Sequence, residues 1–371
     1  MEAPETREEL ASALARGQSV RPVGGGTKLG WGPPLPQPLV ELSTRGLDRI
    51  VEHNVGDLTA ILEAGVPLAD AQERFAAAGQ RLALDPPLGD GGAATIGGVV
   101  AAADSGPLRS RYGAARDLVI GVTVALSDGN VASAGGKVIK NVAGYDLAKL
   151  FAGSFGTLGV IVEVAVRLHP LPKRTVTAVG STADPAPLAR AGAALSHAPL
   201  EHEGFDLRFG GGDGALLARF GGSAAEKQAE TAVALMRAEG LTTALVDEDE
   251  AVWERQRAGQ RSREGTVVRV SGLQTQLGEL LATATGLGAR VVGRVPLGIS
   301  YVRLEDRSTG EMAEGVDRLR AELAPSPCVV LDGPAEARAD PWGTPDAVGL
   351  MARVKRRFDP AGVMSPGLLP V

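Results

Sequence analysis

Three glycine-rich segments in the first 161 residues have the composition of a ligand-binding site. They are 22–28 (PVGGGTK), 86–98 and 153–161, and each lies beside an expected strand. Consecutive glycines can adopt positive φ angles and direct several backbone N–H groups at one point, an arrangement that binds phosphate groups. Small residues also let a strand approach a flat ring closely. Together the segments predict a long ligand with phosphates at its centre and an aromatic plane at each end, such as FAD.

Other nucleotide-binding motifs fit the sequence less well. The first segment lacks the Gly-Lys-Ser/Thr ending of a P-loop. Residues 89–94 (GDGGAA) match the dinucleotide fingerprint weakly, but Gly106, Pro107 and Gly113 interrupt the helix that a Rossmann unit requires. Taken singly, each glycine segment is also compatible with a flexible turn or with close packing of one backbone on another.

Composition excludes several classes of protein. The chain has 371 residues with 38 Lys and Arg against 44 Asp and Glu, a net charge of −6, so it does not have the basic character of a nucleic-acid-binding chain. Its single cysteine, Cys328, excludes an intramolecular disulfide, a cysteine zinc finger and an iron–sulfur cluster held by this chain alone. Only four histidines are present, and no metal site is predicted.

The sequence predicts a cytoplasmic protein. Its uninterrupted apolar stretches, such as 96–103, are far shorter than the roughly 20 residues of a membrane-spanning helix. The acidic start, MEAPE, lacks the apolar region of a signal peptide.

Periodicity predicts an α+β chain with short connections. A helix begins at Thr6 with the capping-box spacing to Glu9 and ends before Gly17. The other expected helices are 67–78, 145–151, 184–196, 223–239, 273–285, 309–323 and 346–358. The expected strands are 20–23, 59–63, 118–126, 158–168, 174–180, 205–209, 214–220, 241–246, 265–270, 289–296, 299–305 and 327–332. The segment 170–173 (PLPK) is the expected domain boundary, and 247–250 is expected to be a solvated helix start.

In order and spacing, several motifs resemble the FAD-binding domain of the vanillyl-alcohol-oxidase/PCMH family. These motifs are 22–28, 93–98 with 105–107 and 112–113, 140–147 (KNVAGYDL) and 153–161. The 140–147 run is similar to the FAD-binding subunits of bacterial glycolate oxidases, and 358–367 is similar to the closing segment of the family. The resemblance covers roughly residues 20–170 and 346–371.

The resemblance implies a three-part organisation. Residues 1–172 would form a PCMH-type FAD-binding domain of two α+β subdomains, and 173–332 an α/β cap domain with a mainly antiparallel sheet. Residues 333–371 would return to the FAD domain.

The resemblance also implies a set of cofactor-binding residues. The backbone of 22–27 would hold the pyrophosphate, 89–95 and 102–105 would line the pyrophosphate and flavin side, and 155–161 would contact the adenine half or the flavin edge. The expected cofactor-binding residues are Pro22, Val23, Gly24, Gly25, Gly26, Thr27, Gly89, Gly91, Gly92, Ala93, Ala94, Thr95, Gly97, Gly98, Ala102, Ser105, Gly106, Tyr112, Gly156, Thr157, Gly159, Val160 and Ile161. Some relatives attach flavin through a histidine in the first segment; 24–26 are glycines here, so FAD is expected to be non-covalent.

The activity implied is that of an FAD-binding subunit of a glycolate oxidase-type 2-hydroxy-acid dehydrogenase. In such an enzyme hydride passes from the substrate to flavin N5, and electrons leave through an iron–sulfur partner subunit. A second FAD-binding catalytic subunit is the other expected partner, and association with the membrane surface would come through the complex.

The chain departs from catalytic relatives in ways that keep two alternatives open. Phe155 stands where many carry Glu, Ser365 stands where the family usually has Asn, and residues 203–371 contain no histidine for the His/His/Glu site of catalytic members. One alternative is a self-sufficient D-lactate or glycolate dehydrogenase with an arginine-lined pocket, for which Arg269 and Arg303 are candidates. The other is a non-catalytic scaffold with a vestigial flavin site. No catalytic residue is assigned, and Lys140 and Tyr145 are further candidate contacts to the cofactor.

Overall fold

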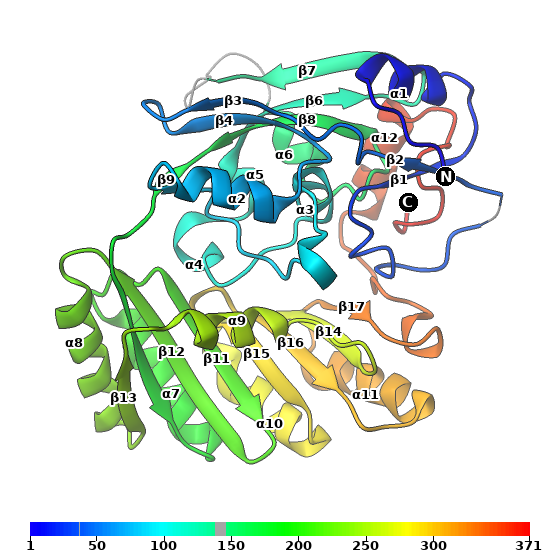
Figure 1. Cartoon of the computed structure of the whole chain (residues 1–371). Coiled ribbons are helices and arrows are strands. Elements are labelled where there is room, and N and C mark those ends of the chain that lie inside the picture. The colour runs from blue at the N-terminus through cyan, green and yellow to red at the C-terminus, as the bar shows by residue number, and fades with distance from the viewer. Residues whose placement is uncertain (37, 138–145) are drawn as a thin grey trace. The chain divides into compact units, whose positions relative to one another are not determined.

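The computed structural model describes residues 1–36, 38–137 and 146–371. The chain forms two compact units (Figure 1). Unit 1 comprises Met1–Gly106, Tyr112–Leu171 and Thr344–Val371, and unit 2 comprises Pro107–Arg111 and Pro172–Gly343. Within these described residues, no helix is long and apolar enough to cross a membrane.

Unit 1 contains antiparallel and parallel sheets. Within its described residues the largest sheet has five antiparallel strands in the order β3-β4-β8-β6-β7. These strands are β3 (Ile50–Asn54), β4 (Thr59–Glu63), β8 (Val160–Arg167), β6 (Val119–Ala125) and β7 (Val131–Gly135). A separate parallel pair is formed by β1 (Val20–Val23) and β2 (Val40–Ser43), and a short antiparallel pair by β5 (Gln80–Arg81) and β9 (His169–Pro170). The helices are α1 (Arg7–Leu14), α2 (Leu68–Ala76), α3 (Ile96–Ala102), α5 (Ala115–Leu118), α6 (Ala148–Phe151) and α12 (Val348–Phe358), and α4 (Arg109–Tyr112) contributes its last residue.

Local sequence explains where the first helix begins. Thr6 caps α1 by accepting a hydrogen bond from the Glu9 backbone N–H, as predicted. The Glu9 carboxylate accepts from the Glu5 N–H rather than from Thr6, so the reciprocal half of a capping box is absent here. Leu10 and Leu14 are fully buried, because the helix packs its apolar side into the core of this unit.

The expected loop at 86–98 is partly wrong, because its last residues are helical. A short 3₁₀ turn occupies Asp90–Gly92, and α3 begins at Ile96. Thr95 caps α3 by accepting from the Gly98 N–H. This cap and the burial of the α3 side chains outweigh the low helix propensity of Gly97 and Gly98.

Unit 2 is built on an eight-stranded sheet in which every pairing is antiparallel, in the order β13-β10-β12-β11-β15-β16-β14-β17. The predicted α+β class and the antiparallel cap sheet are therefore confirmed. The strands are β10 (Thr175–Ser181), β11 (Gly204–Gly210), β12 (Asp213–Gly221), β13 (Thr242–Val246), β14 (Thr266–Ser271), β15 (Arg290–Arg294), β16 (Ile299–Leu304) and β17 (Cys328–Asp332). The helices are α7 (Pro185–His197), α8 (Ala225–Ala238), α9 (Glu250–Ala258), α10 (Leu277–Leu287) and α11 (Thr309–Glu322).

The two faces of this sheet are covered differently. Leu216 and Ala218 of β12 belong to the large apolar core shared with α7, α8, α10 and α11. The alternate residues Ala215 and Leu217 instead pack with Trp253 of α9. Because successive strand residues point to opposite faces, α9 lies on the face opposite to the four long helices.

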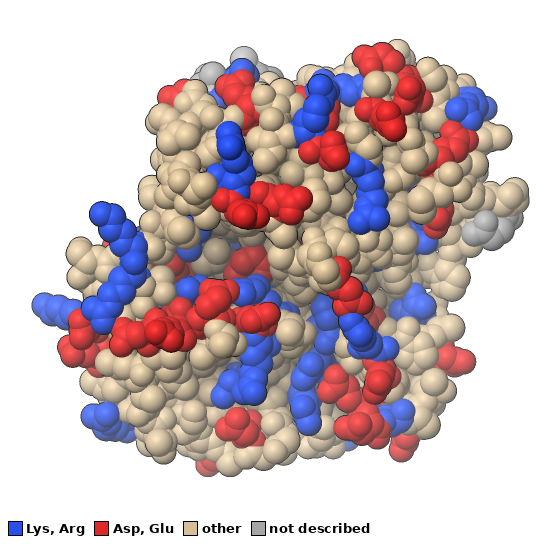
Figure 2. All heavy atoms as spheres, in the orientation of Figure 1, with Lys and Arg blue, Asp and Glu red and all other residues tan. Residues whose placement is uncertain are grey.

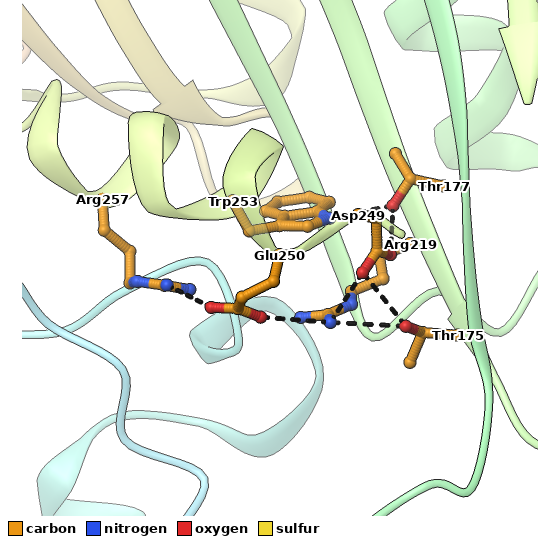
Figure 3. A network of polar contacts seen from close by, with 7 residues as sticks. All are labelled: Thr175, Thr177, Arg219, Asp249, Glu250, Trp253 and Arg257. Carbon is orange, nitrogen blue, oxygen red and sulfur yellow. Dashed lines mark hydrogen bonds and ion pairs between the residues drawn. The ribbon is translucent and has the colours of Figure 1, made fainter. Parts of the chain in front are cut away.

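A buried acid fixes the start of α9 to the sheet, as Figure 3 shows. Segment 247–250 was expected to be solvated, and this is wrong for Asp249, which is only 2% exposed. Asp249 accepts hydrogen bonds from Thr177 Oγ1 at 2.7 Å and from Arg219 Nη2 at 2.8 Å, and Trp253 Nε1 donates to Thr177 Oγ1 at 2.8 Å. Glu250, by contrast, is exposed and pairs with Arg219 and Arg257 at the rim. The pattern of charged residues in the sequence does not show that Asp249 is buried and Glu250 exposed.

Asp249→Ala should therefore destabilise unit 2 far more than Glu250→Ala. Removing one partner of a buried ion pair typically costs about 3–5 kcal/mol, whereas an exposed pair contributes less than about 1 kcal/mol. Urea unfolding followed by tryptophan fluorescence measures both changes. Equal losses in the two variants would contradict a structural role for the buried contact.

Candidate functional site

Unit 1 contains an open cavity of about 820 Å³, a volume that includes space open to solvent. It is formed where the three glycine segments meet, with β1 and α3 contributing to its wall. The predicted cofactor-binding residues that line it are Pro22, Gly24, Gly25, Gly26, Thr27, Thr95, Gly97, Gly98, Ala102, Gly156, Gly159, Val160 and Ile161. The fold thus brings together residues from all three segments, although they are separated by more than a hundred positions in the chain.

Ten predicted residues do not line this cavity. They are Val23, Gly89, Gly91, Gly92, Ala93, Ala94, Ser105, Gly106, Tyr112 and Thr157. Several support its wall from behind: the Ala93 carbonyl abuts Gly25, and Ser105 N–H donates to the Asp104 carboxylate at 2.9 Å. Tyr112 instead accepts a hydrogen bond from Arg81 Nη2 at 2.8 Å through its hydroxyl. Their assignment as cofactor contacts remains a prediction.

The glycines of the first segment are required by its contact with the second. A Cβ on Gly25 would lie 1.6 Å from the Ala93 carbonyl oxygen, and one on Gly24 would lie 2.2 Å from Thr95 Oγ1. The third segment packs similarly, since a Cβ on Gly156, whose φ is +70°, would be 2.9 Å from Pro22 Cγ. Close packing against the Ala93 backbone and against the side chains of Thr95 and Pro22 therefore accounts for these glycines.

The cavity is equipped to receive an anion. Within the described residues, the backbone N–H groups of Gly24, Gly25 and Gly26 have no protein acceptor. The charged residues that line the cavity are Arg21 and Lys28, and the lining includes no aspartate or glutamate among the residues described. The exterior differs: on the face in Figure 2, acidic and basic side chains are interspersed. The donors and the local positive charge fit a diphosphate group.

Nine lining residues are not among the expected cofactor-binding residues, although Phe155 lies in the segment 155–161 that was expected to contact the cofactor. They are Arg21, Lys28, Leu29, Trp31, Thr44, Val99, Ala101, Phe155 and Leu368. Trp31 is 2% exposed, and its ring centroid lies 6.4 Å from that of Phe155, so the two supply an aromatic part of the wall. The basic residue and the tryptophan that follow the three glycines are the sequence signal that could have identified Lys28 and Trp31. Run 140–147, with Lys140 and Tyr145, lies outside the described residues except for its last two positions.

A partly buried lysine attaches the C-terminal segment to this region. Lys355 Nζ donates to the carbonyl oxygens of Thr157 and Met364, each at 2.7 Å, and to Asp359 Oδ2 at 2.5 Å. Burial alone would raise the pKa of Asp359, but hydrogen bonds from Lys355 and the Met364 N–H hold it below its usual value. The tail then pairs with β1, since Ser365 N–H donates to the Val20 carbonyl at 2.8 Å. This course places Leu368 in the cavity wall.

Unit 2 carries a second polar cluster, on the α9 face of its sheet. Asp206 of β11 lies opposite Arg294 of β15 in register, and both are buried. Gln256 Nε2 donates to Asp206 Oδ2 at 3.0 Å, whereas Asp206 Oδ1 has no hydrogen-bond partner in the described chain. The Arg294 guanidinium lies 4.9 Å from the centroid of the Tyr301 ring. Burial raises the pKa of Asp206 from 3.8 to about 6, against the attraction of Arg294 and the hydrogen bond from Gln256.

This raised pKa predicts a pH-dependent stability. The unfolded chain ionises Asp206 near pH 4 and the folded chain near pH 6, so the stabilisation is present below about pH 4 and is lost as the pH rises to about 6. Relative to Asp206→Asn, the wild-type free energy of unfolding should fall by on the order of 3 kcal/mol between pH 4 and pH 7. Urea titrations of both proteins at each pH measure this difference, and a constant difference would contradict the predicted ionisation.

Comparisons with known proteins identify the first unit. Residues 2–135 match the family model described as an FAD binding domain. The glycolate oxidase subunit GlcE of Escherichia coli is 38% identical over 128 residues, which cover 34% of this chain and 36% of that protein. The glycolate oxidase subunit GlcD of Bacillus subtilis is 36% identical over 191 residues, covering 50% of this chain and 40% of that protein. A mitochondrial D-lactate dehydrogenase [cytochrome] of Arabidopsis thaliana is 35% identical over 180 residues, covering 47% and 31%.

These three matches span between 31% and 40% of the length of each curated relative. Among solved structures, alkyldihydroxyacetonephosphate synthase aligns with 98% of this chain and 75% of its own, with a TM-score of 0.73. Its sequence is 14% identical, so this likeness concerns the fold alone.

The contact between the first two glycine segments can be tested by one methyl group. Gly25→Ala would place a Cβ against backbone and force the segments apart, at a cost of about 1–3 kcal/mol or more. Gly30→Ala is the matched control, because nothing lies within 4 Å of its added Cβ. Thermal unfolding together with FAD titration measures both effects. We expect the Gly25 variant to lose thermal stability and FAD affinity, and the Gly30 variant to behave like wild type. The reverse order would show that the contact does not determine stability or FAD binding.

The geometry and the comparisons agree on the cofactor. Three free backbone donors, two cations, an aromatic wall and the absence of acidic side chains among the described lining residues suit a flavin dinucleotide with its central diphosphate. The match of residues 2–135 to the FAD binding domain covers two of the three segments. Residues 2–135 of this chain therefore match an FAD binding domain, and FAD is its cofactor.

Proposed function

We propose that this chain is the FAD-binding subunit of a glycolate oxidase-type 2-hydroxy-acid dehydrogenase. The observation that carries the proposal is the anion-receptive cavity of unit 1, in a chain whose matched relatives include two glycolate oxidase subunits and D-lactate dehydrogenases. FAD, when bound, supplies the acceptor for the hydride that leaves the carbon of a 2-hydroxy acid.

The residues of unit 1 bind and orient this cofactor in the proposal. The N–H groups of Gly24, Gly25 and Gly26 would donate to diphosphate oxygens, with Lys28 supplying positive charge nearby. Trp31 and Phe155 would keep water from a bound ring. No histidine or cysteine occurs among the described lining residues, which supports non-covalent attachment.

The cysteine count is compatible with the electron acceptor and the partners in this proposal. An iron–sulfur cluster requires several thiolate ligands, and this chain has one cysteine, which is buried in unit 2. Electrons would therefore leave through a separate iron–sulfur subunit, and a second FAD-binding subunit would perform the oxidation. The proposal keeps the expected cytoplasmic location, with any membrane association passing through those partners.

One observation favours a second candidate, the self-sufficient dehydrogenase. Arg269 Nε is buried and has no hydrogen-bond partner among the described residues, and Arg269 lies opposite Tyr301 in register. Arg303, diagonal to it across the same strand pair, also has an unpartnered Nε. Two adjacent guanidinium groups without full partners could receive the carboxylate of a small acid. In this alternative the chain would bind and oxidise the substrate unaided.

An anaerobic spectrum separates the two functions. Under the proposal, the chain reconstituted with FAD shows a flavin band that stays oxidised when glycolate or D-lactate is added, and co-purifies with a cysteine-rich subunit from its native host. Bleaching by either substrate would establish unaided oxidation instead, and Arg269→Met should then abolish it while retaining bound FAD. A band that stays oxidised without any co-purifying redox subunit would support the non-catalytic scaffold.

A further inference from the structure

Lys28 has an environment unlike that of an ordinary surface lysine. Its side chain is 8% exposed, and its ammonium lies 3.2 Å from the Asp104 carboxylate, whose own side chain is 3% exposed. The ammonium also donates to Thr27 Oγ1 at 3.2 Å and lies 5.9 Å from the centroid of the Trp31 ring. These contacts hold a flexible side chain in one place beside the cavity.

The ammonium and its counter-charge occupy different positions relative to the cavity. Lys28 lines the cavity, whereas Asp104 does not. An ammonium group has three N–H donors, and the protein contacts found for it are those with Asp104 and Thr27. At least one donor is therefore left for a ligand, while the negative charge of the pair stays behind the wall.

Arg21, the other cation of the cavity wall, makes a structural hydrogen bond instead. Its guanidinium donates to the Leu29 carbonyl and so closes the turn that follows the three glycines. Lys28 sits within that turn and has no such backbone partner. The ammonium of Lys28 is thus the charge that the fold leaves available to an anion.

We propose that Lys28 recognises the diphosphate of a bound dinucleotide, and that Asp104 is the counter-charge that keeps the buried Lys28 ammonium charged before the ligand binds. The inference rests on the proposed use of this cavity as the FAD site. The free N–H groups of Gly24, Gly25 and Gly26 belong to the same turn as Lys28, so backbone dipoles and one full charge act on the same ligand group. A charge-assisted contact of this kind typically changes affinity by about 10- to 100-fold.

Asp104 solves a problem that a lone buried lysine would create. A buried ammonium without a counter-charge is strongly disfavoured before the ligand arrives. Asp104 supplies that counter-charge, and its other oxygen is fixed by the Ser105 N–H at 2.9 Å. The carboxylate also repels a phosphate, so its removal should not weaken anion binding as long as Lys28 remains in place.

The test compares Asp104→Asn with the double variant Lys28→Met/Asp104→Asn. Lys28→Met alone would leave the buried Asp104 carboxylate without a counter-charge and destabilise the fold. The double variant removes both charges at once. Asparagine keeps the oxygen that accepts from Ser105 N–H. The two proteins then differ only in the Lys28 side chain, and thermal unfolding verifies that both fold.

Binding of FAD and of ADP to the full-length apoprotein is measured by calorimetry at several salt concentrations. We expect Asp104→Asn to bind FAD at least as tightly as wild type, and the double variant to bind FAD and ADP about 10- to 100-fold more weakly than Asp104→Asn. The difference in affinity between the two variants should become smaller as salt increases, because the interaction removed with Lys28 is electrostatic. Equal affinities in the two variants, or a gap that salt does not change, would overturn the assignment of Lys28.

The two probes separate this inference from the cofactor assignment. If wild type binds ADP in a Lys28-dependent way but does not bind FAD, the use of the cavity for FAD fails and the recognition of a diphosphate by Lys28 stands. If wild type binds FAD and the variants do not differ, the inference about Lys28 fails and the cofactor stands. If wild type binds neither probe, both fail together.

Discussion

The cavity of unit 1 depends on one contact, in which the backbone of Gly24 and Gly25 lies directly against Ala93 and Thr95. The spacing leaves no room for a Cβ atom on either glycine. The position of the first segment is therefore set by the Ala93 backbone and by the Thr95 side chain, which is itself held as the N-cap of α3. A cavity built in this way is formed before the ligand binds, and less ordering entropy is lost on binding. Glycine, which is entropically unfavourable in a loop, is here the residue that makes the loop rigid.

The charge of the residues that line the cavity differs in sign from the net charge of the chain. The whole chain carries a net charge of −6, yet the described residues that line the cavity include two cations and no acid. At physiological salt, exposed charges are screened beyond about 8 Å, so distant acidic residues on the surface contribute little to the cavity. The backbone donors and the ammonium of Lys28 act at contact distance, where screening is weak. This explains how a chain with a net negative charge can bind a cofactor that carries a diphosphate.

Sequence patterns predicted regular elements well and tertiary placement poorly. Strand β4 has the expected bounds of 59–63, because its short and mostly buried apolar run is a local property of the sequence. Helix α3 was missed, because the glycines that lower its propensity are compensated by packing that only the fold supplies. Asp249 was misassigned for the same reason, since Thr177 and Arg219 reach it from other strands.

The same limit applies to the site. The glycine segments were found because glycine clusters are rare signals with a direct backbone meaning. Leu368 could not be found, because its place in the wall depends on the Lys355 contacts that turn the tail back to β1. Lys28 belongs to the first glycine segment but was not predicted as a cofactor contact. The sequence alone does not show that a buried aspartate pairs with this lysine.

The residues of this chain that could accept a proton bear on whether the chain itself performs the oxidation. Removing hydride from a 2-hydroxy acid also requires a base for the hydroxyl proton, and such a base needs both a suitable pKa and access to the substrate. Asp206 has a pKa of about 6, but it is fully enclosed and already accepts from Gln256, so burial rather than catalysis explains its pKa. Residues 203–371 contain no histidine, and the unpartnered guanidinium nitrogen of Arg269 can bind an anion without accepting a proton. These properties are compatible with the proposed function, in which a catalytic partner performs the proton transfer.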